Sequence, residues 1–263
     1  MKKIDKLWEE RGVVFKDKKE AVMEQSFPDI INNYIHALQI HEIEQFIPKN
    51  THSLCLDVGC GYGRIAEGII KKRKNVFVHG IDIAPTFVKL FNKKLKKKGK
   101  AVVGSADKLP YKNDTFDVVW IVGALMYFEK YKEQMKVVNE LVRVLKPNGK
   151  LILIEPNTVG NNIVKLWGGA PFIYRSILRK PKVETYGIQF RPNQIDGLIK
   201  KTGGEIVYKK GYPLFTILLL PCIVIGKIFP AILPTILHVT KLADEKFSYP
   251  NFSHHITYIV TKK

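Results

Sequence analysis

The stretch LDVGCGYGR at residues 56–64 contains the residue types best suited to bind a ligand. Its three glycines occupy every second position: Gly59, Gly61 and Gly63. A strand that ends in such a turn and leads into a helix presents free backbone N–H groups and a partial positive charge, and both suit a bound polar or anionic group. The dinucleotide fingerprint G-x-G-x-x-G requires a third glycine where Arg64 stands, which argues against a nicotinamide-dependent oxidoreductase.

Two carboxylates accompany the glycines. Asp57 lies just before them, and Asp82 follows about 20 residues after the loop, at the end of the apolar run VFVHGID. Because the carboxyl ends of neighbouring parallel strands meet at one edge of a sheet, we expect both carboxylates and the glycine loop to border one crevice. In that position Asp82 is suited to hold a ribose diol.

Seven β-rich runs provide the elements that must position these residues. They are SLCLDVG, VFVHGIDI, AVVGSAD, FDVVWIVGAL, KLILIEP, EIVYKKGY and HHITYIVTKK, most of them separated by helix-forming stretches. This alternation predicts an α/β fold with a mostly parallel sheet and helices on both faces. Apolar residues at helical spacing in QMKVVNELVRVLK predict a helix, which PNG ends before a strand that begins at Lys150.

Four motifs between about Ser53 and Pro156 occur in family order and spacing: LDVGCGYGR, GIDIAP, GSADKLPYKNDTFDVV and VLKPNGKLILIEP. On these motifs the chain resembles the class I S-adenosylmethionine-dependent methyltransferases, specifically the small-molecule branch known as methyltransferase type 11. The resemblance implies a Rossmann-like fold with a mostly parallel seven-stranded sheet, an antiparallel last strand and helical cap insertions. It also implies methyl transfer with S-adenosylmethionine as the cofactor.

The resemblance also implies which residues bind the cofactor: Asp57, Gly59, Gly61, Gly63, Asp82, Ile83, Ala106 and Asp107. The glycines would let the backbone approach the methionine end of the cofactor, with Asp57 fixing the loop from beneath. Asp82 would accept hydrogen bonds from both ribose hydroxyls. Ile83 would pack on the adenine face, and Asp107, after Ala106, would accept from the adenine amino group. Each residue alone also has an ordinary structural explanation, and their joint occurrence supports the assignment.

The sequence does not identify a catalytic base. A methyl donor of this kind needs mainly an aligned acceptor and exclusion of water, and a base is required only if the acceptor must lose a proton. Tyr127 stands where many relatives carry a histidine, and it can orient an acceptor, relay a proton or only form an aromatic wall. The weaker candidates for a base are His238, His254 and His255. No C-x-x-C pair is present, and we expect no metal site.

The apolar segment at residues 212–239 bears on the acceptor. It contains four prolines and Lys227, and its uncharged part from Tyr212 to Gly226 is shorter than the roughly 20 residues of a spanning helix. Three interpretations stay open: a lid over a hydrophobic acceptor, an element that enters the membrane interface, or a helical pair that fills the core. We expect a small, hydrophobic acceptor such as a lipid, a quinone or a polyketide-like molecule.

The charge balance favours anionic partners. Lys and Arg number 43 against 24 Asp and Glu, a formal net charge of +19. The basic runs KKRKN and NKKLKKKGK lack interleaved aromatic residues, and no RNA-binding module is present, so nucleic acid is not favoured. An RNA methyltransferase and a non-catalytic nucleotide-binding protein of the same fold are the alternatives. The sequence does not indicate the oligomeric state.

The chain is expected to form a single methyltransferase domain over residues 1–263. Its parts are an N-terminal helical cap (1–50), a cofactor-binding core (51–156), a completion of the core with the apolar helical insertion (157–247) and the last strand (248–263). The charged N-terminus carries no secretory h-region, and the three cysteines form no disulfide framework. We therefore expect a cytoplasmic protein, with peripheral contact to anionic membranes as a further hypothesis.

Overall fold

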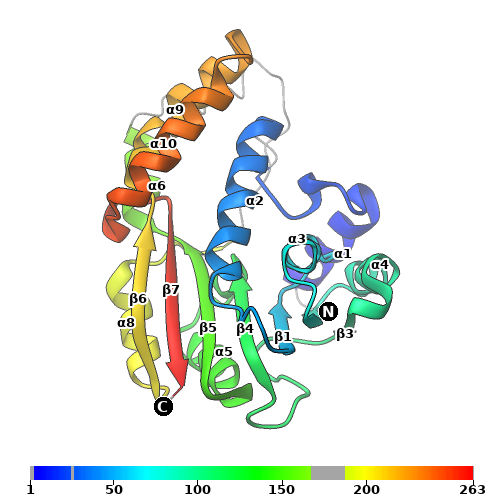
Figure 1. Cartoon of the computed structure of the whole chain (residues 1–263). Helices are drawn as coiled ribbons and strands as arrows, with labels where there is room; N and C mark the ends of the chain where they lie inside the picture. Colours follow the sequence, from blue (N-terminus) through cyan, green and yellow to red (C-terminus); the bar gives the residue numbers. More distant parts are fainter. Residues whose placement is uncertain (1–2, 25–26, 167–186, 263) are drawn as a thin grey trace.

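The computed structural model describes residues 3–24, 27–166 and 187–262. Within these residues a seven-stranded sheet with the order β3-β2-β1-β4-β5-β7-β6 forms the centre of the molecule (Figure 1). The strands are β1 (Ser53–Val58), β2 (Val76–Asp82), β3 (Gly99–Val103), β4 (Phe116–Val122), β5 (Leu145–Pro156), β6 (Gly204–Gly211) and β7 (His255–Lys262). β1 to β5 are parallel, and β7 is antiparallel to both β5 and β6. The expected mostly parallel sheet with an antiparallel last strand is confirmed.

The helices lie on both faces of the sheet, as expected. They are α1 (Lys3–Phe15), α2 (Asp29–Glu44), α3 (Arg64–Lys72), α4 (Pro85–Leu95), α5 (Tyr131–Val144), α6 (Thr158–Leu166), α8 (Pro192–Lys200), α9 (Pro213–Ile228) and α10 (Leu233–Lys246). Apolar side chains of α5 and α8 pack on one face in one core cluster. Those of α2, α3 and α4 pack on the other face in a second cluster. The central strands are therefore covered on both sides, which is typical of parallel sheets.

β5 begins earlier than the sequence predicts. Leu145 pairs with Phe116, and the regular ladder resumes only where Lys150 pairs with Val118. Between them lies the predicted PNG turn, in which Asn148 takes a positive φ of 63°. The difference arises because one residue before the turn already makes a strand contact.

The N-terminal segment contains α1, the short 3₁₀ helix η1 (Lys19–Ala21) and α2. α1 packs beside α4, where the carboxylate of Glu9 accepts a hydrogen bond from the Thr86 backbone N–H at 3.0 Å. Trp8 of α1 also contacts the ring of Phe87. These contacts bring the beginning of the chain to the carboxyl ends of the parallel strands.

α9 and α10 form a helical hairpin that projects from the sheet at the edge where the parallel strands end (Figure 1). Its inner face is core: Phe215, Leu219 and Leu237 pack with Ile31 and Ile35 of α2. At its base the Asp244 carboxylate accepts hydrogen bonds from two backbone N–H groups at the start of α9, both at 2.8 Å. In the described part of the chain, no helix reaches the length and apolarity that crossing a membrane requires.

The four-part division of residues 1–263 stays a prediction. The segment that links α6 to α8 falls largely on residues 167–186, which lie outside the described residues.

Candidate active site

A cavity of about 800 Å³ lies at the carboxyl ends of β1, β2 and β4. The sheet contributes Gly59, Asp82 and Gly123 to its wall, and α1 covers it with residues that include Leu7 and Trp8. The volume is in the range of roughly 300–1,000 Å³ that is usual for ligand pockets. The position is the one where open α/β sheets bind their ligands.

The glycine loop forms one wall of this cavity. Gly59 and Gly61 both line it and have positive φ angles of 70° and 51°. A Cβ atom at Gly61 would lie 2.9 Å from a methyl carbon of Val22, which reaches the loop from the N-terminal segment. The loop backbone is therefore bare where it borders the cavity, and a side chain there would meet protein atoms.

Gly63 is expected to border the ligand with the other two glycines, but it lies outside the cavity wall. It has a φ of 86° and is not among the residues that line the cavity. A Cβ atom there would lie 2.9 Å from the ring of Phe91 in α4. The third glycine therefore permits close packing of α3 against α4 rather than access to a ligand.

Both expected carboxylates line the cavity and are buried. Burial raises the pKa of Asp57 to about 7 and that of Asp82 to about 6. Asp82 accepts hydrogen bonds from the backbone N–H groups of Gly61 at 2.8 Å and Ala84 at 3.0 Å, which leaves acceptor capacity on both oxygens. The Oδ2 atom of Asp57 has no hydrogen-bond partner within the described residues. Such a buried, unpartnered oxygen is suited to a donor from a ligand.

The adenine-side residues divide into two groups. Ile83, Ser105 and Ala106 line the cavity, whereas Asp107 does not. Asp107 instead accepts a hydrogen bond from the Ser105 hydroxyl at 2.5 Å. The structure thus connects Asp107 to the cavity through Ser105 rather than directly.

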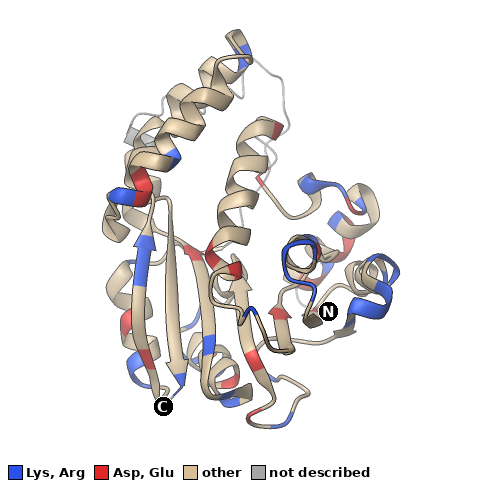
Figure 2. Ribbon diagram, in the orientation of Figure 1, with Lys and Arg blue, Asp and Glu red and all other residues tan. Residues whose placement is uncertain are grey.

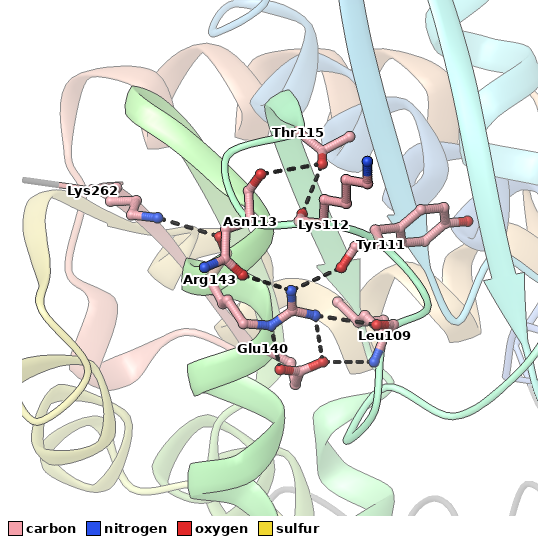
Figure 3. Close-up of polar contacts among 8 residues, drawn as sticks. All are labelled: Leu109, Tyr111, Lys112, Asn113, Thr115, Glu140, Arg143 and Lys262. Atoms are coloured by element: carbon pink, nitrogen blue, oxygen red, sulfur yellow. Dashed lines mark hydrogen bonds and ion pairs between the residues drawn. The ribbon is translucent and has the colours of Figure 1, made fainter.

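The loop that follows Asp107 is held by α5 (Figure 3). The Arg143 guanidinium donates to the carbonyl oxygens of Leu109 at 3.1 Å and Tyr111 at 2.8 Å. Glu140 pairs with Arg143 at 2.6 Å and accepts the Leu109 N–H at 2.7 Å. The Glu140–Arg143 ion pair of α5 therefore fixes the middle of the motif GSADKLPYKNDTFDVV.

Arg64 contributes a cation to the cavity wall, a role that the sequence reasoning missed. Its guanidinium donates to Gln39 Oε1 at 2.9 Å and lies 2.6 Å from Nδ1 of His36. Burial lowers the pKa of Arg64 to about 10, and burial together with this cation lowers the pKa of His36 to about 4. The Nε atom of Arg64 is buried without a partner among the described residues. A carboxylate is the group that such a guanidinium binds best.

Glu155, at the end of β5, is a second residue that the sequence reasoning missed. It is fully buried and accepts hydrogen bonds from three successive N–H groups, those of Ala124 (3.1 Å), Leu125 (2.9 Å) and Met126 (3.2 Å). These bonds fix the short 3₁₀ helix η3 (Leu125–Tyr127) beside the cavity. Burial raises the pKa of Glu155 to about 8.

Tyr127 lines the cavity and meets Trp8 edge to face, with ring centroids 5.3 Å apart. Burial raises the pKa of its phenol to about 12, so the phenol stays protonated at neutral pH. Phe128 lies beside it in the same wall. This arrangement favours an orienting or wall-forming role over that of a base.

The three histidine candidates do not line the cavity, and the expectation of a histidine base is not supported for any of them. His238 is exposed on α10. His254 and His255 contact each other through Nδ1 atoms 2.8 Å apart, and burial lowers both pKa values. β7 begins at the same end of the sheet as the cavity, but His255 pairs with Pro156 at the end of β5, away from the ends of β1, β2 and β4 that form the cavity.

The buried carboxyl groups predict that stability falls as the pH rises above 7. The pKa of Glu155 is about 8 in the folded chain and about 4.3 in an unfolded one, so the folded chain binds more protons and loses stability through this window. The histidines act in the opposite direction but finish titrating near pH 6.5. Between about pH 7 and 8.5 we expect a loss of about 1 kcal/mol from Glu155, at 1.36 kcal/mol per pKa unit.

Chemical denaturation across this range measures the effect. Glu155→Gln removes the titrating group, so its free energy of unfolding should depend less on pH than that of the parent, whatever its absolute stability. Equal slopes for the two proteins would contradict the assignment.

Comparison with known proteins shows which proteins this chain is similar to. Residues 56–153 match the family described as Methyltransferase domain. A sterol 4-C-methyltransferase of Caenorhabditis elegans is 32% identical over 127 residues, which are 46% of this chain and 36% of that protein. A demethylmenaquinone methyltransferase of Thermotoga maritima is 27% identical over 180 residues, 61% of this chain and 72% of that protein. This chain thus matches about a third of the sterol enzyme and most of the quinone enzyme.

The fold agrees with the sequence matches. The crystal structure of geranyl diphosphate C-methyltransferase from Streptomyces coelicolor A3(2) has a TM-score of 0.59 at 11% identity, covering 88% of this chain and 82% of that one. The domain match covers residues 56–153, and the sheet order together with the similar crystal structure shows a Rossmann-like methyltransferase fold.

Proposed function

We propose that the protein transfers the methyl group of S-adenosylmethionine to a small, hydrophobic acceptor. The observation that carries this proposal is the continuity of one cavity from the charged glycine loop to an aromatic wall. Asp57 and Asp82 line this cavity together with the aromatic side chains of Trp8, Tyr127 and Phe128. One cavity thus presents both carboxylates suited to the cofactor and aromatic side chains suited to a hydrophobic acceptor.

The residues of the charged part fit the cofactor. S-adenosylmethionine carries cationic sulfonium and ammonium groups, a carboxylate and a ribose. The unpartnered oxygen of Asp57 suits a cationic donor, and Asp82 has acceptor capacity for the ribose hydroxyls. Arg64 suits the carboxylate, while Ile83 and Ala106 provide an apolar edge for the base. Gly59 and Gly61 leave space for the methionine end; Gly63 and Asp107 support this arrangement from outside the cavity.

The contribution of the chain to the reaction is alignment and exclusion of water. When bound, the cofactor supplies an electrophilic methyl group. α1 covers part of the cavity, and Glu155 holds the turn that carries Tyr127, so the acceptor meets a fixed wall. Orientation of this kind contributes about 7–11 kcal/mol to barrier lowering. A base is required only for an acceptor that must lose a proton, such as a hydroxyl group or a C–H carbon; an acceptor that reacts through an unprotonated atom requires none.

The acceptor class rests on the cavity wall and on the relatives. The named relatives are a sterol methyltransferase and a demethylmenaquinone methyltransferase, both with hydrophobic acceptors in their names. An RNA acceptor is less well supported because the basic runs at residues 71–74 and 93–100 lie at the ends of α3 and α4 and in the connections to β2 and β3, at the amino ends of these strands. Figure 2 shows these Lys and Arg residues over the ends of those helices. The basic residues therefore lie at the amino ends of the strands, whereas the cavity lies at the carboxyl ends.

We also propose that the protein is cytoplasmic and makes peripheral contact with anionic membranes. The formal net charge of +19 supports attraction to anionic lipid. A hydrophobic acceptor would itself partition into a bilayer, which makes access from a membrane surface useful.

Asp82→Ala should weaken binding of S-adenosylmethionine by roughly 1.5–3 kcal/mol, the range for hydrogen bonds to a charged group. Because the pKa of Asp82 is about 6 without cofactor, binding by the parent should also weaken as the pH falls below 6. Calorimetry near neutral pH and near pH 5.5 measures both effects.

Two variants serve as controls. Asp82→Asn keeps one carbonyl acceptor for the loop and should lose this pH dependence, while the surface variant Asp17→Ala should match the parent. Unchanged affinity in Asp82→Ala would remove the residue from the site.

The acceptor is tested with labelled methyl donor and pure candidates: a demethylated quinone, a sterol and geranyl diphosphate. Transfer to any of these in detergent supports the proposal. If the protein binds the cofactor but methylates none of these acceptors and labels purified RNA, the RNA alternative is correct. Binding of NAD in a titration under the same conditions would indicate the oxidoreductase alternative. Binding of S-adenosylmethionine without methyl transfer to any fraction would indicate a non-catalytic protein.

A further inference from the structure

The tip of the α9–α10 hairpin is an apolar surface without a function in the site already described. Residues 227–232, with the sequence KIFPAI, are all exposed. Ile228, Phe229 and Ile232 expose 63%, 57% and 54% of their surface. Large apolar side chains that are clustered at a projecting turn, rather than scattered singly, mark an interaction surface.

The core does not require these side chains. The hairpin is attached through its inner face, where Leu219 and Leu237 are buried against α2, and through Asp244 at its base. The tip lies beyond these contacts and projects away from the sheet (Figure 1). None of the hairpin residues is among those that line the cavity, so the tip is not a lid over it.

Charge on the hairpin fits an anionic surface. From residue 213 to residue 243 the sequence contains no Asp or Glu; Lys227 begins the tip, while Lys241 pairs with Glu245 near the base at 3.7 Å. Figure 2 shows the hairpin almost free of charge between its tip and its base. A lysine beside apolar residues can extend its amine to the lipid headgroups while the stem stays in the apolar layer.

The backbone of the turn is also suited to an apolar environment. The N–H of Phe229 donates to Ile225 O at 2.7 Å, and the N–H of Ile232 donates to Phe229 O at 3.2 Å. Pro230 has no N–H to satisfy, which further lowers the cost of leaving water. The turn can therefore enter the headgroup and acyl boundary without exposing these donors.

We infer that the hairpin tip, Lys227–Ile232, inserts into the interfacial layer of an anionic bilayer and docks the protein there. The choice of a lipid surface as the occupant rests on the proposed function, because a hydrophobic acceptor is held in that phase. Vesicle binding is measured without cofactor or acceptor, and methyl transfer is measured in detergent, so failure of one idea is distinguishable from failure of the other.

The test compares two variants in sedimentation with vesicles of phosphatidylcholine alone or mixed with phosphatidylglycerol. The tip variant combines Ile228→Ser, Phe229→Ser and Ile232→Ser. The control combines Val207→Ser and Tyr208→Ser, which alter half-exposed apolar residues on β6. The parent and the control should bind the anionic vesicles, more weakly as salt rises, and the tip variant should bind at least roughly tenfold more weakly. Thermal unfolding verifies that all three proteins are folded.

A spectroscopic probe locates the insertion. The three native cysteines are buried, so Phe229→Cys offers one accessible thiol for an environment-sensitive dye. The dye should shift to shorter wavelength with anionic vesicles, whereas a dye attached through Val207→Cys should not. Absence of vesicle binding by the parent, or equal binding by the tip variant, would overturn the inference. A parent that dimerises through the tip and ignores vesicles would assign the surface to a second copy instead.

Discussion

Gly61→Val is expected to abolish binding of S-adenosylmethionine while the chain stays folded. The native φ of 51° is in a region that β-branched residues rarely adopt, and a Cβ atom at this position already meets Val22 at 2.9 Å. The added side chain also enters the wall of the cavity. Overpacking and strain together should lower the affinity by at least roughly a hundredfold. Calorimetric titration with the cofactor measures the effect.

The matched control is Gly203→Val. Gly203 has a comparable φ of 74°, but a Cβ atom there meets nothing within 4 Å, and the residue does not line the cavity. This variant should show a similar loss from backbone strain in thermal unfolding and an unchanged cofactor affinity. If folded Gly61→Val binds the cofactor like the parent, the loop does not face the ligand.

Leu219→Glu should destabilise the protein by about 4 kcal/mol or more, enough to unfold much of it at moderate temperature. Leu219 is fully buried between α9 and α2, in the cluster that holds the hairpin to the body of the molecule. A carboxylate there would lose its hydration inside a cluster of apolar side chains, which is costly. Denaturant unfolding followed by circular dichroism gives the change directly.

Val224→Glu provides the comparison on the same helix. Val224 is 45% exposed, so the new carboxylate stays in water and the free energy of unfolding should change by less than about 0.5 kcal/mol. Similar stability for the two variants would mean that the inner face of the hairpin is not part of the core. The two results together separate the core face of the hairpin from its exposed face.

The sequence predicted the sheet and the local parts of the site. Asp57, Gly59 and Gly61 are consecutive features of one strand and turn, and Asp82 ends the neighbouring strand, so their meeting follows from parallel pairing alone. Local spacing does not tell which glycine faces a ligand. Gly63 faces Phe91 because the path of α4 is set by contacts outside the motif.

Long-range contacts account for what the sequence analysis missed. The cover over the cavity comes from α1, fixed through Glu9 to Thr86 at the start of α4. Glu155 lies some thirty positions from the three N–H groups that it accepts, and a carboxylate at a strand end has no sequence pattern that distinguishes it from a surface residue. The GxGxGR spacing was a usable signal for Arg64, whose guanidinium follows the bare loop directly.

The apolar segment shows why composition alone left three interpretations open. Residues 212–239 contain both the buried Leu219 and the exposed Phe229. Which face is buried depends on the packing of α2, a helix from the other end of the chain. Core filling describes the inner face, and the exposed tip keeps the membrane hypothesis testable.

The central claim is methyl transfer from this cavity to a hydrophobic molecule. The most direct measurement incubates the purified protein and methyl-labelled S-adenosylmethionine with an organic-solvent extract of cellular lipids, and in parallel with total RNA. The account predicts label in the organic phase with the parent protein, none with Gly61→Val, and none in RNA with either protein. Label that enters RNA, or a parent that binds the cofactor and labels no fraction, would contradict it.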